Sequence, residues 1–341
     1  MVTKKLDIFI PIRKPILHFE EKWFPYFNLS INELLEFINN TSFPDEFYPI
    51  NQIRAQVYDE YDSDKRLADN WRKNELTFKF NLFCFLHLEI PYSITPEYAQ
   101  QIRKWNPDHK FTKKDIHELM LHGLSAQIEK LIRDFFIAQS IAKPGSIFAT
   151  GPALIFDKDT LVLTTAKLWN GLHEAKEHIA KIGWPIFGDL NLSDVWNWMQ
   201  KSFPNETVST RITRAIAAYS YLFVESSVSS DTSLIWAVMG VEALYTTGNT
   251  GLLNQIKDKS ALILGEPKKY KNKLSAMYAF RSKLIHGSAD LPRQHYQPEI
   301  DNKFDREYGE SSDLATAILV CTFQYLVKNN IHEFEFNYTL K

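Results

Sequence analysis

The N-terminal part of the chain carries the alternating pattern of a β-strand. From Leu76 to Ile90 every even-numbered position is apolar. Most odd-numbered positions between them are polar, among them His87 and Glu89. A period of two residues predicts a strand with one buried face. Residues 6–12 predict a second, shorter strand.

Helical and hairpin patterns follow these predicted strands. Apolar residues recur at mostly helical spacing over residues 115–141, which predicts one long helix. Two apolar runs within residues 153–163 flank the acidic segment 157–159, and such segments favour chain reversal. We therefore expect a β-hairpin at this position. Two further helices are expected, at residues 165–181 and 193–202.

The pattern becomes continuously helical after residue 204. Short polar segments at 229–232 and 311–313 supply side chains suited to cap helix N-termini. Residues 288–310 contain two prolines and few aliphatic residues, which predicts a long loop. Five helices are expected, at residues 209–226, 231–246, 250–264, 269–286 and 311–328.

These patterns predict an α+β protein with two domains. Residues 1–204 form the expected mixed α+β domain, and residues 205–341 form the expected all-α domain. A chain of 341 residues is long enough for each domain to bury its own core. The patterns do not indicate what the N-terminal domain does, and sensing, regulation and substrate selection are all open roles.

Charge and cysteine content indicate which ligands and which cellular compartment suit the protein. The net charge is −2, but residues 252–287 contain eight basic and two acidic residues. Phosphate groups are attracted to such a basic patch. The two cysteines lie far apart in apolar runs, which excludes a disulfide framework and a cysteine-based zinc site and fits a reducing compartment. With no signal sequence and no long apolar run, we expect a cytoplasmic protein that does not contact a membrane.

The segment Tyr278-Ala-Phe-Arg281-Ser282-Lys-Leu-Ile-His286-Gly287 has the strongest chemical character in the chain. Arg281 offers a fixed fork of hydrogen-bond donors that suits phosphate. His286 can accept and donate protons near neutral pH. Ser282 could orient either group or hold a phosphate. An alternative interpretation is that His286 only stabilises the C-terminal end of a helix.

The spacing within this segment constrains the site. Five residues on a regular helix correspond to a rotation of roughly 500°, so Arg281 and His286 would face different directions. Gly287 favours the left-handed turn that ends a helix and would free His286 from the helical register. Glu242 is the only charge in the apolar segment 234–245, and we expect it to pair with Arg281 or, alternatively, with Arg211 or Arg214.

Two segments resemble the two-histidine helix motif of zinc proteases: His117-Glu-Leu-Met-Leu-His122 and His173-Glu-Ala-Lys-Glu-His178. In each pair the second histidine comes one residue too late to share a helix face with the first. We therefore expect neither a metal ion nor another cofactor.

The Arg281–His286 segment, together with the upstream helix Trp236-Ala-Val-Met-Gly-Val-Glu242-Ala-Leu244, resembles the Apea-like HEPN domain family. The resemblance covers roughly residues 205–330. It implies an all-α bundle of HEPN type, a homodimer, and a metal-independent RNA endonuclease of the kind found in antiphage or toxin systems.

In this interpretation Arg281, His286, Ser282 and Glu242 form the catalytic group. The neighbouring basic residues Lys283, Lys273, Lys271 and Lys269 bind RNA. A regulatory protein or a phage-derived trigger is a further expected partner. The alternative from the same residues is a HEPN-like dimer that binds RNA, a nucleotide or a protein partner without cleaving, and a purely structural helical domain is a third possibility.

Overall fold

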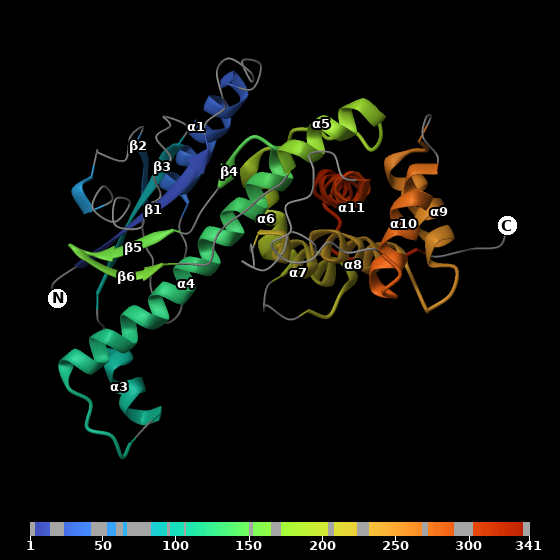
Figure 1. Ribbon diagram of the computed structural model, residues 1–341. Helices are drawn as coiled ribbons and strands as arrows, with labels where there is room; N and C mark the ends of the chain where they lie inside the picture. The colour runs from blue at the N-terminus through green and yellow to red at the C-terminus, as the bar shows by residue number, and fades with distance from the viewer. Residues whose placement is uncertain are drawn as a thin grey trace. The chain divides into compact units, whose positions relative to one another are not determined.

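The computed structural model of the chain divides into two compact units (Figure 1). Unit 1 comprises Met1–Phe136 and Ala149–Leu168, and unit 2 comprises Ile137–Phe148 and Trp169–Lys341. Within them the structure describes residues 4–13, 24–41, 53–58, 64–66, 83–93, 96–105, 107–149, 153–164, 172–203, 208–223, 232–267, 272–289 and 303–336.

Unit 1 is built on an antiparallel sheet with the strand order β2-β3-β1-β5-β6. The expected strand at residues 6–12 and the expected hairpin at 153–163 are both confirmed. The backbone φ of Lys158 is +56° in the hairpin turn. The strands are β1 (Lys4–Arg13), β2 (Arg54–Tyr58), β3 (Phe83–Tyr92), β5 (Leu154–Asp157) and β6 (Thr160–Thr164).

The prediction of one buried face for the strand within residues 76–90 is wrong for β3. Every side chain from Cys84 to Leu88 is buried, including those that point to opposite faces. One face of the sheet is aliphatic, and the other carries a buried aromatic cluster of Phe9, Phe85 and Phe156. Because both faces are covered, a polar residue in β3 is also buried. Residues 67–82 lie outside the described part of the chain.

In the described part of unit 1, the helices beside the sheet include α1 (Phe24–Asn40), α3 (Pro96–Trp105) and α4 (Lys113–Ala142). The long helix expected at 115–141 is confirmed by α4, which begins in unit 1 and continues into unit 2. His117 of α4 lies 2.9 Å from Lys4 Nζ and 3.1 Å from Tyr92 Oη, two residues on the aliphatic side of the sheet. The short strand β4 (Phe148–Ala149) lies where the chain returns to unit 1.

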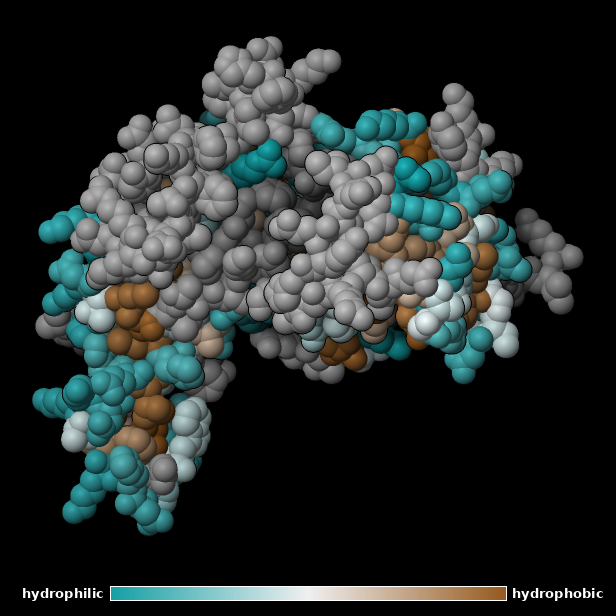
Figure 2. Space-filling view, viewed as in Figure 1, coloured by the Kyte–Doolittle hydropathy of each residue, from teal (hydrophilic) through white to brown (hydrophobic). Residues whose placement is uncertain are grey.

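Most of the coloured surface of α3 and the first turns of α4 is hydrophilic, with a narrow hydrophobic strip between them (Figure 2). No helix in the described residues combines the length and the apolar character needed to cross a membrane.

Unit 2 is helical, with α11 at its centre. Every residue of α11 from Leu314 to Gln324 is buried, and α11 packs against α5, α6, α8, α9 and α10. The mixed N-terminal part and helical C-terminal part confirm the expected α+β class. The helices are α5 (Leu172–Ile182), α6 (Leu192–Ser202), α7 (Arg211–Ser220), α8 (Ser233–Tyr245), α9 (Leu252–Leu264), α10 (Asn272–Ile285) and α11 (Lys303–Lys328), with a 3-10 helix at Tyr221–Phe223.

The start of α11 differs from the expectation. We expected a loop over residues 288–310 and a helix cap at 311–313, but α11 begins at Lys303 and includes the expected cap. Aromatic contacts explain the longer helix, because the rings of Phe304 and Tyr308 pack against Phe280 of α10 at centroid distances of 5.5 and 6.4 Å. The loop prediction counted aliphatic residues and gave no weight to these rings.

The compact units do not follow the boundary expected at residue 204. Helices α5 and α6 belong to unit 2, because they pack against α11. Trp198 of α6 donates a hydrogen bond to the carbonyl of Ile331 at 2.8 Å, and the backbone N–H of Gly188 donates to Gln324 Oε1 of α11 at 2.9 Å. Both contacts tie residues before 204 to the helical core.

Gly240 allows α8 and α11 to approach closely. A Cβ atom at this position would lie 2.7 Å from Leu319 Cδ2, well inside van der Waals contact. Leu319 is fully buried, so its side chain has little room to move. The absence of a side chain at residue 240 therefore sets how closely α8 and α11 can pack.

We predict that Gly240→Ala lowers the free energy of unfolding by about 1–3 kcal/mol, because overpacking outweighs the better helix propensity of alanine. Urea unfolding measures the change. Gly309→Ala in α11 is the matched control, since nothing lies within 4 Å of its added Cβ, and we expect it to leave stability unchanged or raise it. Equal stability of the two variants would contradict the role of close packing.

Candidate functional site

Glu242 of α8 and Arg281 of α10 form an ion pair in unit 2. Arg281 Nη2 lies 3.1 Å from Glu242 Oε2, and the two side chains are 19% and 17% exposed. The predicted pairing across two packed helices is therefore confirmed. Because both charges are largely removed from water, each stabilises the other more than a fully exposed pair would.

The alternative partners of Glu242 bind elsewhere. Arg211 Nη1 donates to the carbonyl of Thr246 at 2.6 Å, beyond the C-terminal end of α8. Arg214 donates to the carbonyls of Thr210 and Ser209. A cation at a helix C-terminus is favoured by the carbonyls that lack partners there. The alternative ion pairs with Glu242 are therefore wrong.

Tyr278 completes the group around Glu242. Its hydroxyl donates a hydrogen bond to Glu242 Oε1 at 2.6 Å, and the Arg281 guanidinium lies 5.6 Å from the centroid of its ring. Burial raises the pKa of the Tyr278 hydroxyl, and the hydrogen bond and charge of Glu242 raise it further. The hydroxyl therefore stays protonated at neutral pH, so each oxygen of Glu242 accepts one hydrogen bond. The sequence alone did not predict this role of Tyr278, because a tyrosine within a helix also fits an apolar position.

Arg281 retains donors that Glu242 does not use. A guanidinium has five N–H donors, and the hydrogen bond to Glu242 engages Nη2. Nε is buried and has no hydrogen-bond partner in the described part of the chain. A buried donor without an acceptor costs about 1–3 kcal/mol. Nε itself lies beneath the surface, so an anionic group would meet the donors of the guanidinium that Glu242 does not use.

His286 lies at the end of α10, where Gly287 has the expected left-handed conformation with φ of +67°. The N–H of Ser288 donates to the carbonyl of Lys283 at 2.9 Å and that of Gly287 to Leu284 at 3.3 Å, the pattern of a Schellman motif. The imidazole is exposed, and within the described residues no hydrogen bond joins it to Arg281. Ser282 is half-buried, and its carbonyl accepts the N–H of His286 at 3.0 Å.

The predicted RNA-binding lysines have different surroundings. Lys283 is exposed and lies two residues after Arg281. Lys273 forms an ion pair with Glu310, and its hydrogen bond lowers the pKa of that carboxyl group. Lys269 and Lys271 lie outside the described residues.

Lys259, another residue of the expected basic patch, is buried. This side chain is 2% exposed, and its ammonium group donates to Gln255 Oε1 at 3.1 Å and lies 5.1 Å from the ring centroid of Phe336. Burial lowers its pKa. The positive charge counted along residues 252–287 is therefore only partly available at the surface.

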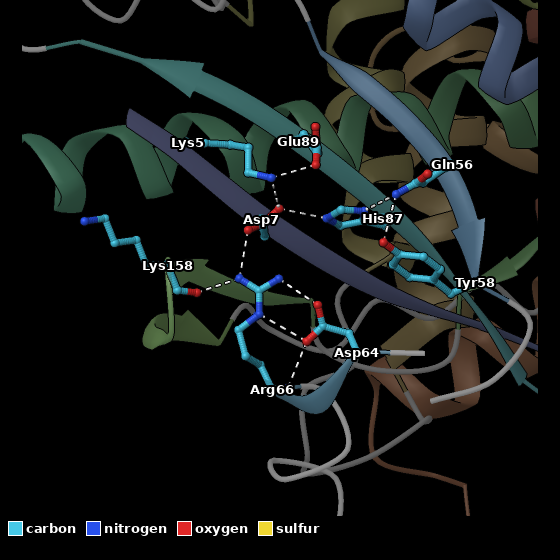
Figure 3. Close-up of polar contacts among 9 residues, drawn as sticks. All are labelled: Lys5, Asp7, Gln56, Tyr58, Asp64, Arg66, His87, Glu89 and Lys158. Carbon is cyan, nitrogen blue, oxygen red and sulfur yellow. Dashed lines mark hydrogen bonds and ion pairs between the residues drawn. The ribbon is translucent and has the colours of Figure 1, made fainter. Parts of the chain in front are cut away.

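A second polar cluster lies on the aromatic face of the sheet in unit 1 (Figure 3). At its centre Asp7 of β1 is 4% exposed and accepts hydrogen bonds from two sides. His87 Nε2 lies 2.9 Å from Asp7 Oδ1, and Arg66 Nη1 lies 2.8 Å from Asp7 Oδ2. Lys5 Nζ lies 3.2 Å from Asp7 Oδ1 and 2.7 Å from Glu89 Oε1.

Arg66 and His87 are themselves held in place. Arg66 donates two hydrogen bonds to Asp64, at 3.1 and 2.7 Å. The ring of His87 stacks on Phe9 and Tyr58 at centroid distances of 4.6 and 5.1 Å. Burial by itself would raise the pKa of Asp7, but hydrogen bonds from His87 and Arg66, the charge of Arg66 and the hydrogen bond from Lys5 outweigh it. The pKa of Asp7 therefore lies well below its usual range.

This cluster is not evident from the sequence because its members are far apart in the chain. Asp7 and His87 are 80 residues apart, and the period-two pattern placed His87 on a solvent-facing side. The available signal was a single polar residue inside an apolar run of each strand, Asp7 in the run 6–12 and His87 in the run 83–88. A buried polar residue requires a partner, so these two lone residues could have been matched.

We predict that Asp7→Asn lowers the free energy of unfolding at neutral pH by about 3–5 kcal/mol, because Arg66, His87 and Lys5 lose the buried carboxylate that they share and Arg66 keeps only Asp64 as a counter-charge. The pKa of Asp7 is lower in the folded than in the unfolded state, so its stabilising contribution is present above about pH 4 and is lost as the pH falls below that value. Urea unfolding at neutral and acidic pH should show a difference between wild type and variant that shrinks with acidification.

Asp159→Asn is the matched control for this substitution, because Asp159 is exposed in the hairpin turn of the same unit. We expect it to change stability little at either pH. A pH-independent difference between wild type and Asp7→Asn would contradict the low pKa.

Comparison of the whole chain with protein-family models, with curated proteins and with solved structures gives no match.

Proposed function

We propose that unit 2 is an RNA endonuclease that acts without a metal ion. The observation that carries the proposal is the partly exposed Arg281 guanidinium, a cation oriented by Glu242 and Tyr278 that uses only Nη2 in its hydrogen bond to Glu242. Such a fixed donor group suits a phosphate whose charge grows in the transition state. The histidine capable of proton transfer follows five residues later at the end of the same helix.

In the proposed reaction His286 removes the proton from a ribose 2′-hydroxyl. The 2′-oxygen then forms a bond to the adjacent phosphorus, and the bond from phosphorus to the 5′-oxygen of the next nucleotide breaks. The leaving 5′-oxygen takes up a proton from water, and His286 returns the proton it removed to the solvent, so the products carry a 2′,3′-cyclic phosphate and a 5′-hydroxyl. Arg281 donates hydrogen bonds to the phosphoryl oxygens throughout. DNA lacks the nucleophile and is not cleaved.

Single-stranded RNA is the substrate class that fits this reaction. Its backbone can place the 2′-oxygen in line with the leaving oxygen, and its bases can be splayed apart. Lys283 is exposed on the last turn of α10 and adds positive charge that attracts the RNA backbone to this end of the helix.

The complete site requires a second copy of the chain. Residues five apart on a helix point about 140° away from each other, and α10 remains regular to Ile285. Arg281 therefore works with the His286 of a second copy across a two-fold homodimer interface, which brings identical surfaces together. In this proposal unit 1 responds to a regulatory protein or a phage-derived trigger in the cytoplasm.

One observation favours a second candidate function. His286 is exposed, and no hydrogen bond in the described residues orients its imidazole. A catalytic base is usually held by a partner group, whereas RNA binding needs only the charge of Arg281 and Lys283. The alternative is therefore a HEPN-like dimer that binds RNA without cleaving it.

We predict that the purified full chain cleaves single-stranded RNA in the presence of EDTA and leaves 2′,3′-cyclic phosphate ends. Arg281→Ala should lower kcat/KM by about 10²–10³-fold because the transition state loses its donors. His286→Ala should lower it by about 10²–10⁴-fold because the general base is removed. Extract of phage-infected cells is added as the source of the expected trigger. The product ends are identified by mass spectrometry.

Matched controls are Arg214→Ala and His122→Ala, which remove an exposed arginine and an exposed histidine elsewhere in the chain. Both should cleave like wild type. If wild type binds the RNA tightly but leaves it intact with and without extract, the binding function replaces the nuclease. If Arg281→Ala unfolds, the ion pair with Glu242 is structural.

We further predict that mixing the Arg281→Ala and His286→Ala proteins restores cleavage. After subunit exchange a mixed dimer has one site with both residues intact, so about a quarter of wild-type activity should return. The assay follows RNA cleavage against mixing time, and each variant mixed with itself is the control. No recovery despite subunit exchange would place the whole site within one chain.

A further inference from the structure

Three side chains on neighbouring strands of unit 1 present metal-ligating atoms to one point. Asp7 and Glu89 are directly paired across β1 and β3, and His87 lies two residues before Glu89 on the same face of the sheet. One ligating atom from each of Asp7, His87 and Glu89 lies within 4.8 Å of the others. The three side chains converge from the two adjacent strands (Figure 3).

The positively charged ammonium group of Lys5 occupies the point at which these ligating atoms meet. Its Nζ lies between the carboxylates, 2.7 Å from Glu89 Oε1 and 3.2 Å from Asp7 Oδ1. The Lys5 side chain is 48% exposed, whereas Asp7 is 5% and His87 3% exposed. Lys5 can therefore swing into solvent while the buried ligands remain in place, and this exposed side offers an entry path.

The charges of the cluster match a divalent cation once Lys5 has moved. Asp7, Asp64 and Glu89 then contribute three negative charges, against one positive charge on Arg66. Arg66 contacts Asp7 through Oδ2, while His87 and Lys5 lie at Oδ1. Arg66 and Lys5 thus contact different oxygens of Asp7. Once Lys5 has moved, Oδ1 is available for an ion without displacement of Arg66.

Gln56 and Tyr58 allow His87 to act as a ligand through Nε2. A ligating histidine needs its proton on the other ring nitrogen and an acceptor for it. Nδ1 lies 2.9 Å from the amide nitrogen of Gln56, and that nitrogen lies 2.9 Å from Tyr58 Oη. Rotation of the amide by a half-turn would place Oε1 there, where it accepts from both His87 Nδ1–H and Tyr58 O–H.

We propose that Asp7, His87 and Glu89 form a site for a divalent transition-metal ion, which Zn²⁺ probes best and which displaces the Lys5 ammonium. One imidazole nitrogen and two carboxylates belong to the ligands that Zn²⁺ uses, and a water completes four-fold coordination. The imidazole favours such an ion over Mg²⁺ or Ca²⁺, which prefer oxygen ligands throughout. The site is independent of the proposed RNA cleavage and lies in the other unit.

Isothermal titration of the chelator-treated full chain with ZnCl₂ tests the proposal. Wild type should bind Zn²⁺, and MgCl₂ should give no comparable binding. Glu89→Gln should weaken the affinity by at least about tenfold, because one ligand loses its charge. Lys5→Met should strengthen it by at least about tenfold, because the competing cation is gone while all three ligands remain.

Lys114→Met and Glu118→Gln are the matched controls, since they alter an exposed ion pair with side chains 83% and 63% exposed in the same unit. Neither should change the affinity. Equal Zn²⁺ binding by wild type and Glu89→Gln would place the ion at other histidines and overturn the proposal. So would a Lys5→Met protein that binds no more tightly than wild type, and this variant decides the question if Glu89→Gln does not fold.

Discussion

Removing a charged side chain from water is so unfavourable that its partners determine where it can lie, and this constraint shapes both polar clusters of the protein. In unit 2, Glu242 sits in an otherwise apolar helix and is accommodated by Arg281 and Tyr278. In unit 1, Asp7 sits in an apolar strand and is accommodated by Arg66, His87 and Lys5. In both places hydrogen bonds and counter-charges fix the orientation of the charged side chain.

The parts of the fold that could be predicted rest on local physics. Glu242 is the only charge in its apolar helix, which was sufficient to predict an ion pair with Arg281, Arg211 or Arg214, because a buried carboxylate needs a counter-charge. Gly287 was sufficient to predict a left-handed helix end, because glycine alone has no steric penalty there. Helical and strand periods likewise located α4, β1 and the β5–β6 hairpin.

The parts that could not be predicted depend on contacts between distant residues. The role of Tyr278 required knowledge that its hydroxyl meets Glu242 rather than a hydrophobic neighbour, since a tyrosine fits an apolar stripe equally well. The start of α11 depends on Phe280, which lies in another helix. His87 was assigned to solvent because a period of two residues cannot tell whether the second face of a strand is also covered.

The helix end at Gly287 has an evolutionary consequence. Hydrogen bonds between backbone atoms set the path of the chain through residues 283–288, and the side chain of residue 286 takes no part in them. Replacing that exposed side chain leaves the turn and the ion pair of Arg281 intact. Under the proposed function, active and inactive forms of this domain therefore differ by one codon and fold equally well. Descendant lineages can lose a costly activity and regain it without passing through an unstable intermediate.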